Sequence, residues 1–203
     1  MLGFPPNTEL SRQLPKKTIY TKFQMNNAER AKIDADISRI TIVNEVSAEK
    51  LHIAAGEKVK TFFVLLVTLK RKEFDVKTII KILKLIPQKM LLVLECGGVA
   101  KLAIYHTKLM QTGWMRAEEH KIELKGLNLD TVWENIVIAV GGVNIEKGNS
   151  LDEQIEINDK RQILEKAIAR IEKKARAEKQ PKKKFELVEA EKKLKEQLKL
   201  LEG

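Results

Sequence analysis

The sequence has few cysteines and no long apolar run, and both shortages exclude classes of protein. Cys96 is the only cysteine among 203 residues. A single thiol cannot form an intrachain disulfide or a multi-cysteine metal site, so we expect a reducing, cytoplasmic setting. The longest apolar run, FFVLLV, is far too short to span a bilayer, and prolines interrupt the opening MLGFPPNTELSRQLPKK where a signal peptide needs apolar residues. We therefore expect a soluble protein that does not enter a membrane.

Motifs for metals, nucleotides and nucleophilic catalysis are also missing. His52, His106 and His120 lie far apart in the chain, with no second histidine or cysteine at ligand spacing, so we expect structural roles for them and no metal. Cys96 has no evident base beside it, which favours a buried or half-buried thiol over a nucleophile. The glycine pairs match neither a Walker loop nor a dinucleotide fingerprint. The sequence predicts no catalytic residue and no cofactor.

What the sequence does have is positive charge. The formal net charge is +10 at pH 7, and 33% of the residues are charged. Such a balance favours a polyanionic partner, either nucleic acid or an anionic membrane face. Net charge alone does not choose between the two partners.

Residues 1–150 alternate strand-like and helix-like segments and predict an α+β body. NNAERAKIDADI predicts a short helix with Asn27 as its N-cap, SRITIVNEVS a strand, and VKTFFVLLVTLKRK a central strand covered on both faces. DVKTIIKILKLIP has helical spacing between the cap Asp75 and the stop Pro87. KMLLVLECGGVAKLAIYH predicts a β-hairpin, TGWMRAEEHKIEL another strand, and LDTVWENIVIAV a helix ended by the next glycine pair. We expect one mixed β-sheet with helices packed on it.

The composition changes near GNSLDEQIEIND, where we place a boundary around residues 148–157, and residues 158–203 predict a helical tail. Apolar residues there recur at sevens, fours and threes on both sides of Pro181. Two arms of similar length joined at a proline favour an antiparallel helical (coiled-coil) hairpin. The alternative is that each arm pairs with a second copy and forms a homodimer. The stripes consist of Ile157, Leu164, Ile168, Ile171 and Ala175, then Leu187, Leu194, Leu198 and Leu201.

The bend of this tail concentrates its charge. Residues 158–203 carry 15 basic and 9 acidic side chains, and residues 170–184 alone carry 8 and 2, so the whole excess of +6 lies at the bend. We interpret this patch as a contact for phosphates, the alternative being a solvated, lysine-rich turn. No aromatic residue is interleaved with it, which argues against base stacking and for backbone contact without sequence preference. The basic tip, as we call it, consists of Arg170, Lys173, Lys174, Arg176, Lys179, Lys182, Lys183 and Lys184.

The order of expected elements from residue 28 to residue 95 resembles the core of restriction-endonuclease-like folds. In those enzymes an acid and a lysine two residues apart on a central strand, with an Asp on the neighbouring strand, hold Mg²⁺ and activate water. Here VTLK places Thr68 where the carboxylate belongs and Lys70 in the lysine position. Glu29 and Glu45 are not a sufficient substitute. An active nuclease is not expected, whereas a silent relative that grips DNA stays open.

Five stretches carry a family resemblance: MLGFPPNTELSRQLPKKTIY, AAGEKV, IPQKMLLVLE, GLNLDTVWENIV and LEKAIARIEKKARAEKQPKKKFELVEAEKKLKEQL. Together they resemble the domain of unknown function 4391 family over nearly the full chain. The resemblance implies an accessory protein encoded beside helicases and DNA methyltransferases of restriction-modification or antiphage systems in bacteria and archaea.

We therefore predict a non-enzymatic accessory protein that docks on a helicase or DNA methyltransferase and contacts the DNA or RNA backbone through the basic tip. The alternatives are a restriction-endonuclease-like nuclease, active or degenerate, and a purely structural coiled-coil adaptor.

Overall fold

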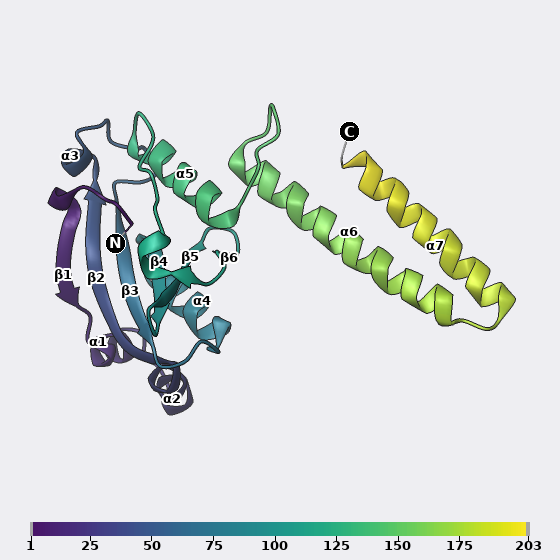
Figure 1. Cartoon of the computed structure of the whole chain (residues 1–203), viewed down its shortest axis with the longest axis horizontal. Helices are drawn as coiled ribbons and strands as arrows, with labels where there is room; N and C mark the ends of the chain where they lie inside the picture. The colour runs from purple at the N-terminus through teal and green to yellow at the C-terminus, as the bar shows by residue number, and fades with distance from the viewer. Residues whose placement is uncertain (1, 202–203) are drawn as a thin grey trace. The chain divides into compact units, whose positions relative to one another are not determined.

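The computed structural model describes residues 2–201, and the chain divides into two compact units, residues 1–143 and 144–203. The first unit holds a β-sheet with packed helices, and the second consists mainly of two long helices (Figure 1). The strands are β1 (Glu9–Gln13), β2 (Ile37–Ser47), β3 (Thr61–Leu69), β4 (Lys89–Cys96), β5 (Val99–Tyr105), β6 (Leu109–Gln111) and β7 (Met115–Arg116). The helices are α1 (Lys16–Lys22), α2 (Asn27–Asp36), α3 (Ala48–Leu51), α4 (Val76–Leu85), α5 (Leu129–Gly141), α6 (Leu151–Ala177) and α7 (Pro181–Leu200).

The sheet is mixed, as the sequence predicts. Among the described residues it has seven strands in the order β1-β2-β3-β4-β5-β6, with β7 pairing to β5 off this path. Neighbouring strands are antiparallel except β3 and β4, which are parallel. The connection between these two runs through α4, because parallel neighbours need a crossover rather than a tight turn. The α+β class with helices packed on a mixed sheet is therefore confirmed.

Both faces of the sheet are covered, which explains the unbroken apolar run of β3. Side chains alternate between the faces of a strand, so Phe62 and Phe63 point to opposite sides. The Phe62 ring packs against the Trp133 ring of α5, tilted at 52°, with the ring centroids 5.2 Å apart. Phe63 packs against the cluster that includes Ile33 of α2 and Ile79 of α4. The helices α1, α2 and α4 therefore cover one face and α5 covers the other.

Local signals set the ends of the elements. The N-cap of α2 is Asn26, not Asn27 as predicted, because the Asn26 and Glu29 side chains exchange hydrogen bonds with each other's backbone N–H in a capping box. The predicted β-hairpin is confirmed between β4 and β5. Gly97 and Gly98 both have positive φ, +59° and +82°, which suits the two-residue turn that matches strand twist.

The prediction of a strand over TGWMRAEEHKIEL is wrong for most of that stretch. Only Met115 and Arg116 pair with β5, and a 3₁₀ turn at Ala117–Glu119 follows at once. The next residues pair instead with the N-terminus, since Ile122 donates its N–H to the Leu2 carbonyl at 3.2 Å. Tertiary pairing with a distant segment thus decides this region, and local composition does not show it.

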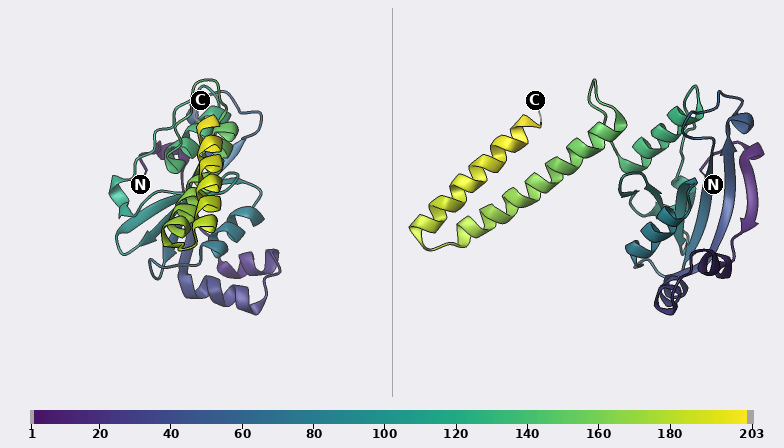
Figure 2. Two further views of the ribbon diagram at one scale, coloured as in Figure 1. Left: turned by 90° about the vertical axis from the view of Figure 1, so that its right-hand side faces the viewer. Right: turned by 180° about the vertical axis from the view of Figure 1, so that it is seen from behind.

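The second unit contains two long helices, α6 and α7. The helix α6 starts after Ser150, whose side chain forms a capping box with Glu153, and α7 starts at Pro181. The two helices lie side by side and run in opposite directions (Figure 2). The Lys195 ammonium of α7 lies 3.0 Å from the Glu172 carboxylate of α6. Within residues 2–201, no helix combines the length and the apolarity that crossing a membrane requires.

Candidate functional site

The basic tip lies where α6 ends and α7 begins (Figure 1). Arg170, Lys173, Lys174 and Arg176 lie in the last two turns of α6, and Lys179 in the connection. Lys182, Lys183 and Lys184 occupy the first turn of α7. All eight side chains are exposed. The structure therefore gathers the residues of the basic tip at one end of the helix pair.

Few ion pairs link the cations of the basic tip to acids. Within residues 2–201, Arg176 is the one cation of the eight that forms an ion pair, with Glu172 at 3.9 Å. Glu172 pairs more closely with Lys195, whose hydrogen bond lowers the pKa of that carboxyl. Glu178 accepts the backbone N–H of Gln180 at 2.9 Å. With 8 basic and 2 acidic side chains in residues 170–184, the tip keeps a large excess of positive charge exposed to water.

The start of α7 adds an electrostatic conflict. A helix N-terminus carries partial positive charge from its unpaired N–H groups, and acids or anions stabilise it. The first turn of α7 contains no acid, and its N-cap, Gln180, makes no side-chain capping bond. Three lysines stand there instead. A negatively charged ligand at this end relieves both the dipole and the lysine repulsion.

The surface beside the tip is hollowed. The hollow measures about 540 Å³ and lies between the end of α6 and the second turn of α7. Its lining mixes cations, two acids and apolar carbon, which suits contact with a ligand that has both charged and apolar parts. The lining residues are Lys174, Ala177, Glu178, Lys183, Glu186 and Leu187.

One residue of this site was missed by the sequence argument. Phe185 follows Lys184 directly, and 67% of its surface is exposed. No aromatic residue lies within residues 170–184, but Phe185 is the next residue along the chain. The signal that could have found it is its position two residues before Leu187, off the leucine stripe of α7.

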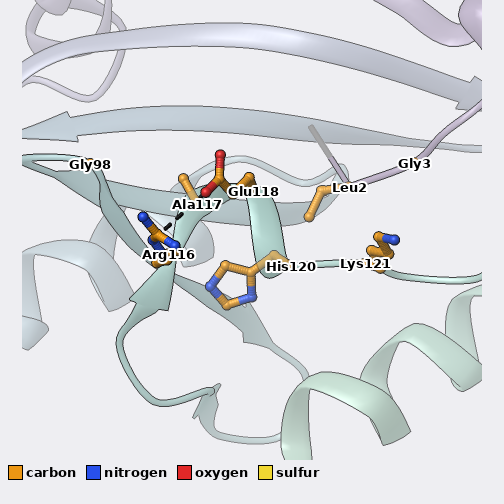
Figure 3. Close-up of a pocket in the computed structure, with 8 residues that line it drawn as sticks. All are labelled: Leu2, Gly3, Gly98, Arg116, Ala117, Glu118, His120 and Lys121. Atoms are coloured by element: carbon orange, nitrogen blue, oxygen red, sulfur yellow. Dashed lines mark ion pairs between the residues drawn. The ribbon is translucent and has the colours of Figure 1, made fainter.

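A second hollow, of about 550 Å³, lies in the first unit (Figure 3). Its floor includes His120, which is 4% exposed and whose Nε2 bonds to the Ala100 carbonyl at 2.9 Å. At its rim Arg116 faces Glu118 at 3.7 Å, and both side chains are highly exposed. Because the Glu118 carboxylate offsets the Arg116 cation, this hollow lacks the uncompensated charge of the basic tip. Nothing in it pairs a nucleophile with a base.

The other candidate ligands do not converge. His52 ends α3, His106 follows β5, and His120 lines the hollow just described. Cys96, at the end of β4, is half-buried as expected and packs against the core. Among residues 2–201, no three His, Cys, Asp or Glu side chains form a group that could hold a metal ion.

The residues compared with a nuclease centre are spread over the sheet. Thr68 of β3 is opposite Arg39 and Glu95, and Lys70 lies beyond the strand end. Glu45 pairs with Phe63, five residues from Thr68, a separation of about 16 Å along the strand. The carboxylate of Glu45 holds Lys50 at 2.8 Å, and that of Glu29 pairs with Lys81. Neither acid is free to replace the carboxylate that Thr68 lacks.

Two acids that the sequence argument did not single out lie nearer Lys70. Its Nζ donates to the Asp34 carbonyl at 2.6 Å, and its N–H donates to the Asp36 carbonyl at 2.8 Å. The Asp36 carboxylate, in a residue 3% exposed, accepts bonds from Arg71 at 2.7 and 3.0 Å and from the Asp75 N–H at 2.8 Å. Burial raises the pKa of Asp36, but these donors outweigh it and hold the pKa below its usual value. We call this arrangement of Asp36, Arg71 and Asp75 the closed node, because its donors occupy the Asp36 carboxylate.

Comparison with known proteins identifies a family but no individual protein similar to this chain. No curated protein and no solved structure matches the chain. The model of one family matches residues 2–198, which is nearly the whole chain and includes both units. The chain therefore belongs to the family described as Domain of unknown function (DUF4391).

Proposed function

We propose that the protein is a non-enzymatic accessory protein that holds the phosphate backbone of nucleic acid at its basic tip. The observation that carries the proposal is the exposure of all eight cations of the tip, almost without acid partners. Lysine and arginine that neutralise phosphates release condensed counterions, which drives binding without reading the bases. The conflict at the start of α7 supports the same ligand, because a phosphate there relieves it.

In this proposal, the element that carries the interface is an antiparallel coiled-coil hairpin formed by α6 and α7 of one chain. The apolar stripes of the two helices support it, since Ile168 and Ala175 of α6 are buried. The Arg161 guanidinium also donates to the Leu201 carbonyl at 2.6 Å, which ties the far end of α7 to α6. A helix pair stabilised along its length holds the basic tip at the end where α6 meets α7. A homodimer through these helices is the rival arrangement.

The proposal extends to a protein partner, a helicase or a DNA methyltransferase, docked on the first unit. What supports a docking surface is an apolar groove of about 360 Å³ beside α1, rimmed by Arg12 and Lys22. Leu14 and Phe23 are half-buried in it. Size-exclusion chromatography of the chain with either enzyme tests this. A complex that tolerates Leu14→Asp places the partner elsewhere.

A nuclease is the less favoured alternative. The Asp34 carboxylate bonds to Lys16 and Tyr20 and the Asp36 carboxylate to Arg71 and the Asp75 N–H, and among residues 2–201 no group of three acids forms that could hold Mg²⁺. A purely structural adaptor becomes the favoured alternative only if the basic tip binds no nucleic acid.

Charge reversal in the first turn of α7 tests the proposed function. We expect the triple variant Lys182→Glu, Lys183→Glu, Lys184→Glu to weaken binding to every DNA and RNA. The slope of log affinity against log salt should flatten by about three units on duplex and about two on single strands, if all three lysines touch phosphate. Acids in a first helical turn are favourable by about 0.3–1 kcal/mol each, so the melting temperature should not fall. Fluorescence anisotropy over a salt series gives the slopes.

The matched control reverses three exposed lysines farther along the same helix, Lys192, Lys193 and Lys199. It changes the net charge equally but leaves the tip intact. We expect a much smaller loss of affinity and a nearly unchanged slope. Equal losses in the two variants would show that only overall charge matters, and no loss in either would remove nucleic acid as the ligand.

A further inference from the structure

We infer that the ligand of the basic tip is a single-stranded nucleic acid, and that an unpaired base stacks on Phe185. The inference rests on the proposed function and specifies its substrate class. It adds a contact to a base face where the proposal has contacts to phosphates only.

Phe185 is the one aromatic residue in residues 144–203. Exposure alone argues little, because Ile163 is also 67% exposed and single apolar residues are common on surfaces. The position of Phe185 distinguishes it. It directly follows the three lysines of the first turn of α7, whereas Ile163 lies in the middle of α6.

Helical geometry places Phe185 on the outer side of α7. Successive residues turn by about 100°, so Phe185 lies about 160° around the helix from the half-buried Leu187. Lys182 and Lys184 lie about 60° and 100° to its two sides. The ring therefore stands between two cations on the face turned away from α6. Packing between the helices does not need it there.

The neighbours of Phe185 along α7 give the ligand a direction. Val188, 46% exposed, lies one turn beyond Phe185 on the same side and extends the apolar surface. Glu189 follows, and its carboxylate repels phosphate. The phosphates of the ligand are therefore favoured near Lys182 and Lys184, which precede Phe185 along α7. The base is favoured over Phe185 and Val188, farther from the start of the helix.

This combination fits single strands better than duplexes. Proteins that bind single strands combine a basic track for the backbone with aromatic side chains on which bases stack, with little sequence preference. In a duplex the base faces are covered by their neighbours, so Phe185 contributes nothing unless a base step is opened. Phosphates alone do not distinguish the two forms in this way.

The test uses the full chain and four labelled probes of equal length: single-stranded DNA, single-stranded RNA, duplex DNA and an abasic DNA strand that has phosphates but no bases. We expect the single strands to bind more tightly than the abasic strand and the duplex. Phe185→Ala should weaken single-strand binding about five- to a hundredfold and leave the abasic strand unaffected. Phe185→Trp should restore binding, and Ile163→Ala is the matched control. Circular dichroism verifies that each variant stays helical.

The outcomes separate this inference from the proposed function. If the lysine reversals weaken binding but Phe185→Ala does not, or if the abasic strand binds as tightly as the normal one, the phosphate contact stands and stacking is excluded. If no probe binds, the proposed function fails first. If Phe185→Ala instead dissociates a dimer or a protein complex, Phe185 is a protein contact and the inference is wrong.

Discussion

At the residue scale, Asp36 is the least exposed ionised group beside Lys70. We expect its charge to stabilise the folded chain. Asp36→Asn keeps the shape but removes the charge that Arg71 and the Asp75 N–H recognise. Hydrogen bonds to charged groups are worth about 1.5–3 kcal/mol, so we expect a loss of that order in the free energy of unfolding. Urea denaturation at pH 7 measures it. The exposed pair Arg116–Glu118 gives the control, since Glu118→Gln should change stability by less than about 0.5 kcal/mol.

The pH dependence of this loss has a definite sign. Because folding lowers the pKa of Asp36 below 3.8, the unfolded chain binds the proton more readily than the folded one. Its stabilising contribution is therefore complete above pH 3.8 and is lost as the pH falls through the lower, folded value. The difference between the native chain and Asp36→Asn should shrink only in that acid range. A difference that already vanishes at pH 6 would mean that the charge of Asp36 is not what stabilises the node.

At the element scale, Asp130 fastens α5 to the segment between α3 and β3. Its carboxylate accepts the N–H groups of Glu57 at 2.7 Å, Lys58 at 3.1 Å and Val59 at 2.7 Å. Residue 56 is glycine where a Cβ would come within 2.4 Å of the Asp130 Oδ1. We expect Asp130→Ala to accelerate hydrogen exchange at these three amides, while amides shared by β3 and β4 keep their protection.

The comparison variant for this experiment is Glu134→Ala, one turn along α5 and exposed. It should leave all of these amides unchanged. Equal exchange at residues 57–59 in the native chain and Asp130→Ala would mean that the segment is held by other contacts.

The elements that the sequence predicts well are those with strong periodicity and a cap. The helix α4 between Asp75 and Pro87 and the hairpin at Gly97 and Gly98 are of this kind. The strand β1 and helix α1 were missed. The strand is short, polar and mostly exposed, and its place in the sheet depends on pairing with β2. Such pairing is a long-range effect that local patterns do not contain.

The candidate site likewise has one part that the sequence predicts and another part that depends on tertiary packing. The eight cations of the basic tip can be predicted from the sequence, because the net charge of a segment follows from counting its basic and acidic residues. The outward position of Phe185 depends on which face of α7 meets α6, and that follows only from the packed pair. The closed node around Asp36 needs three segments that the fold alone brings together, namely the end of α2, the residues just after β3 and the cap of α4.

At the scale of the whole molecule, the two units should be separable by protease. Residues 144–149 have no regular secondary structure, and Lys147 there is exposed. Trypsin cuts exposed, irregular backbone first, so we expect early cleavage after Lys147 and a resistant fragment of residues 1–147. Mass spectrometry of a time course identifies it. Lys147→Gln should remove this cut and leave early cleavage at Lys179 in the connection between α6 and α7. Simultaneous loss of both parts would show that neither is stable without the other.

The strand order of the sheet has a consequence for synthesis on the ribosome. From β1 to β6, each strand lies beside the strand that precedes it in the chain. Each newly emerged strand therefore finds its neighbour already outside the exit tunnel, and the cost of closing long loops stays small. Residues 144–203 follow only after the sheet is complete. The cation-rich bend thus reaches the cell's polyanions attached to a body that has already had time to fold.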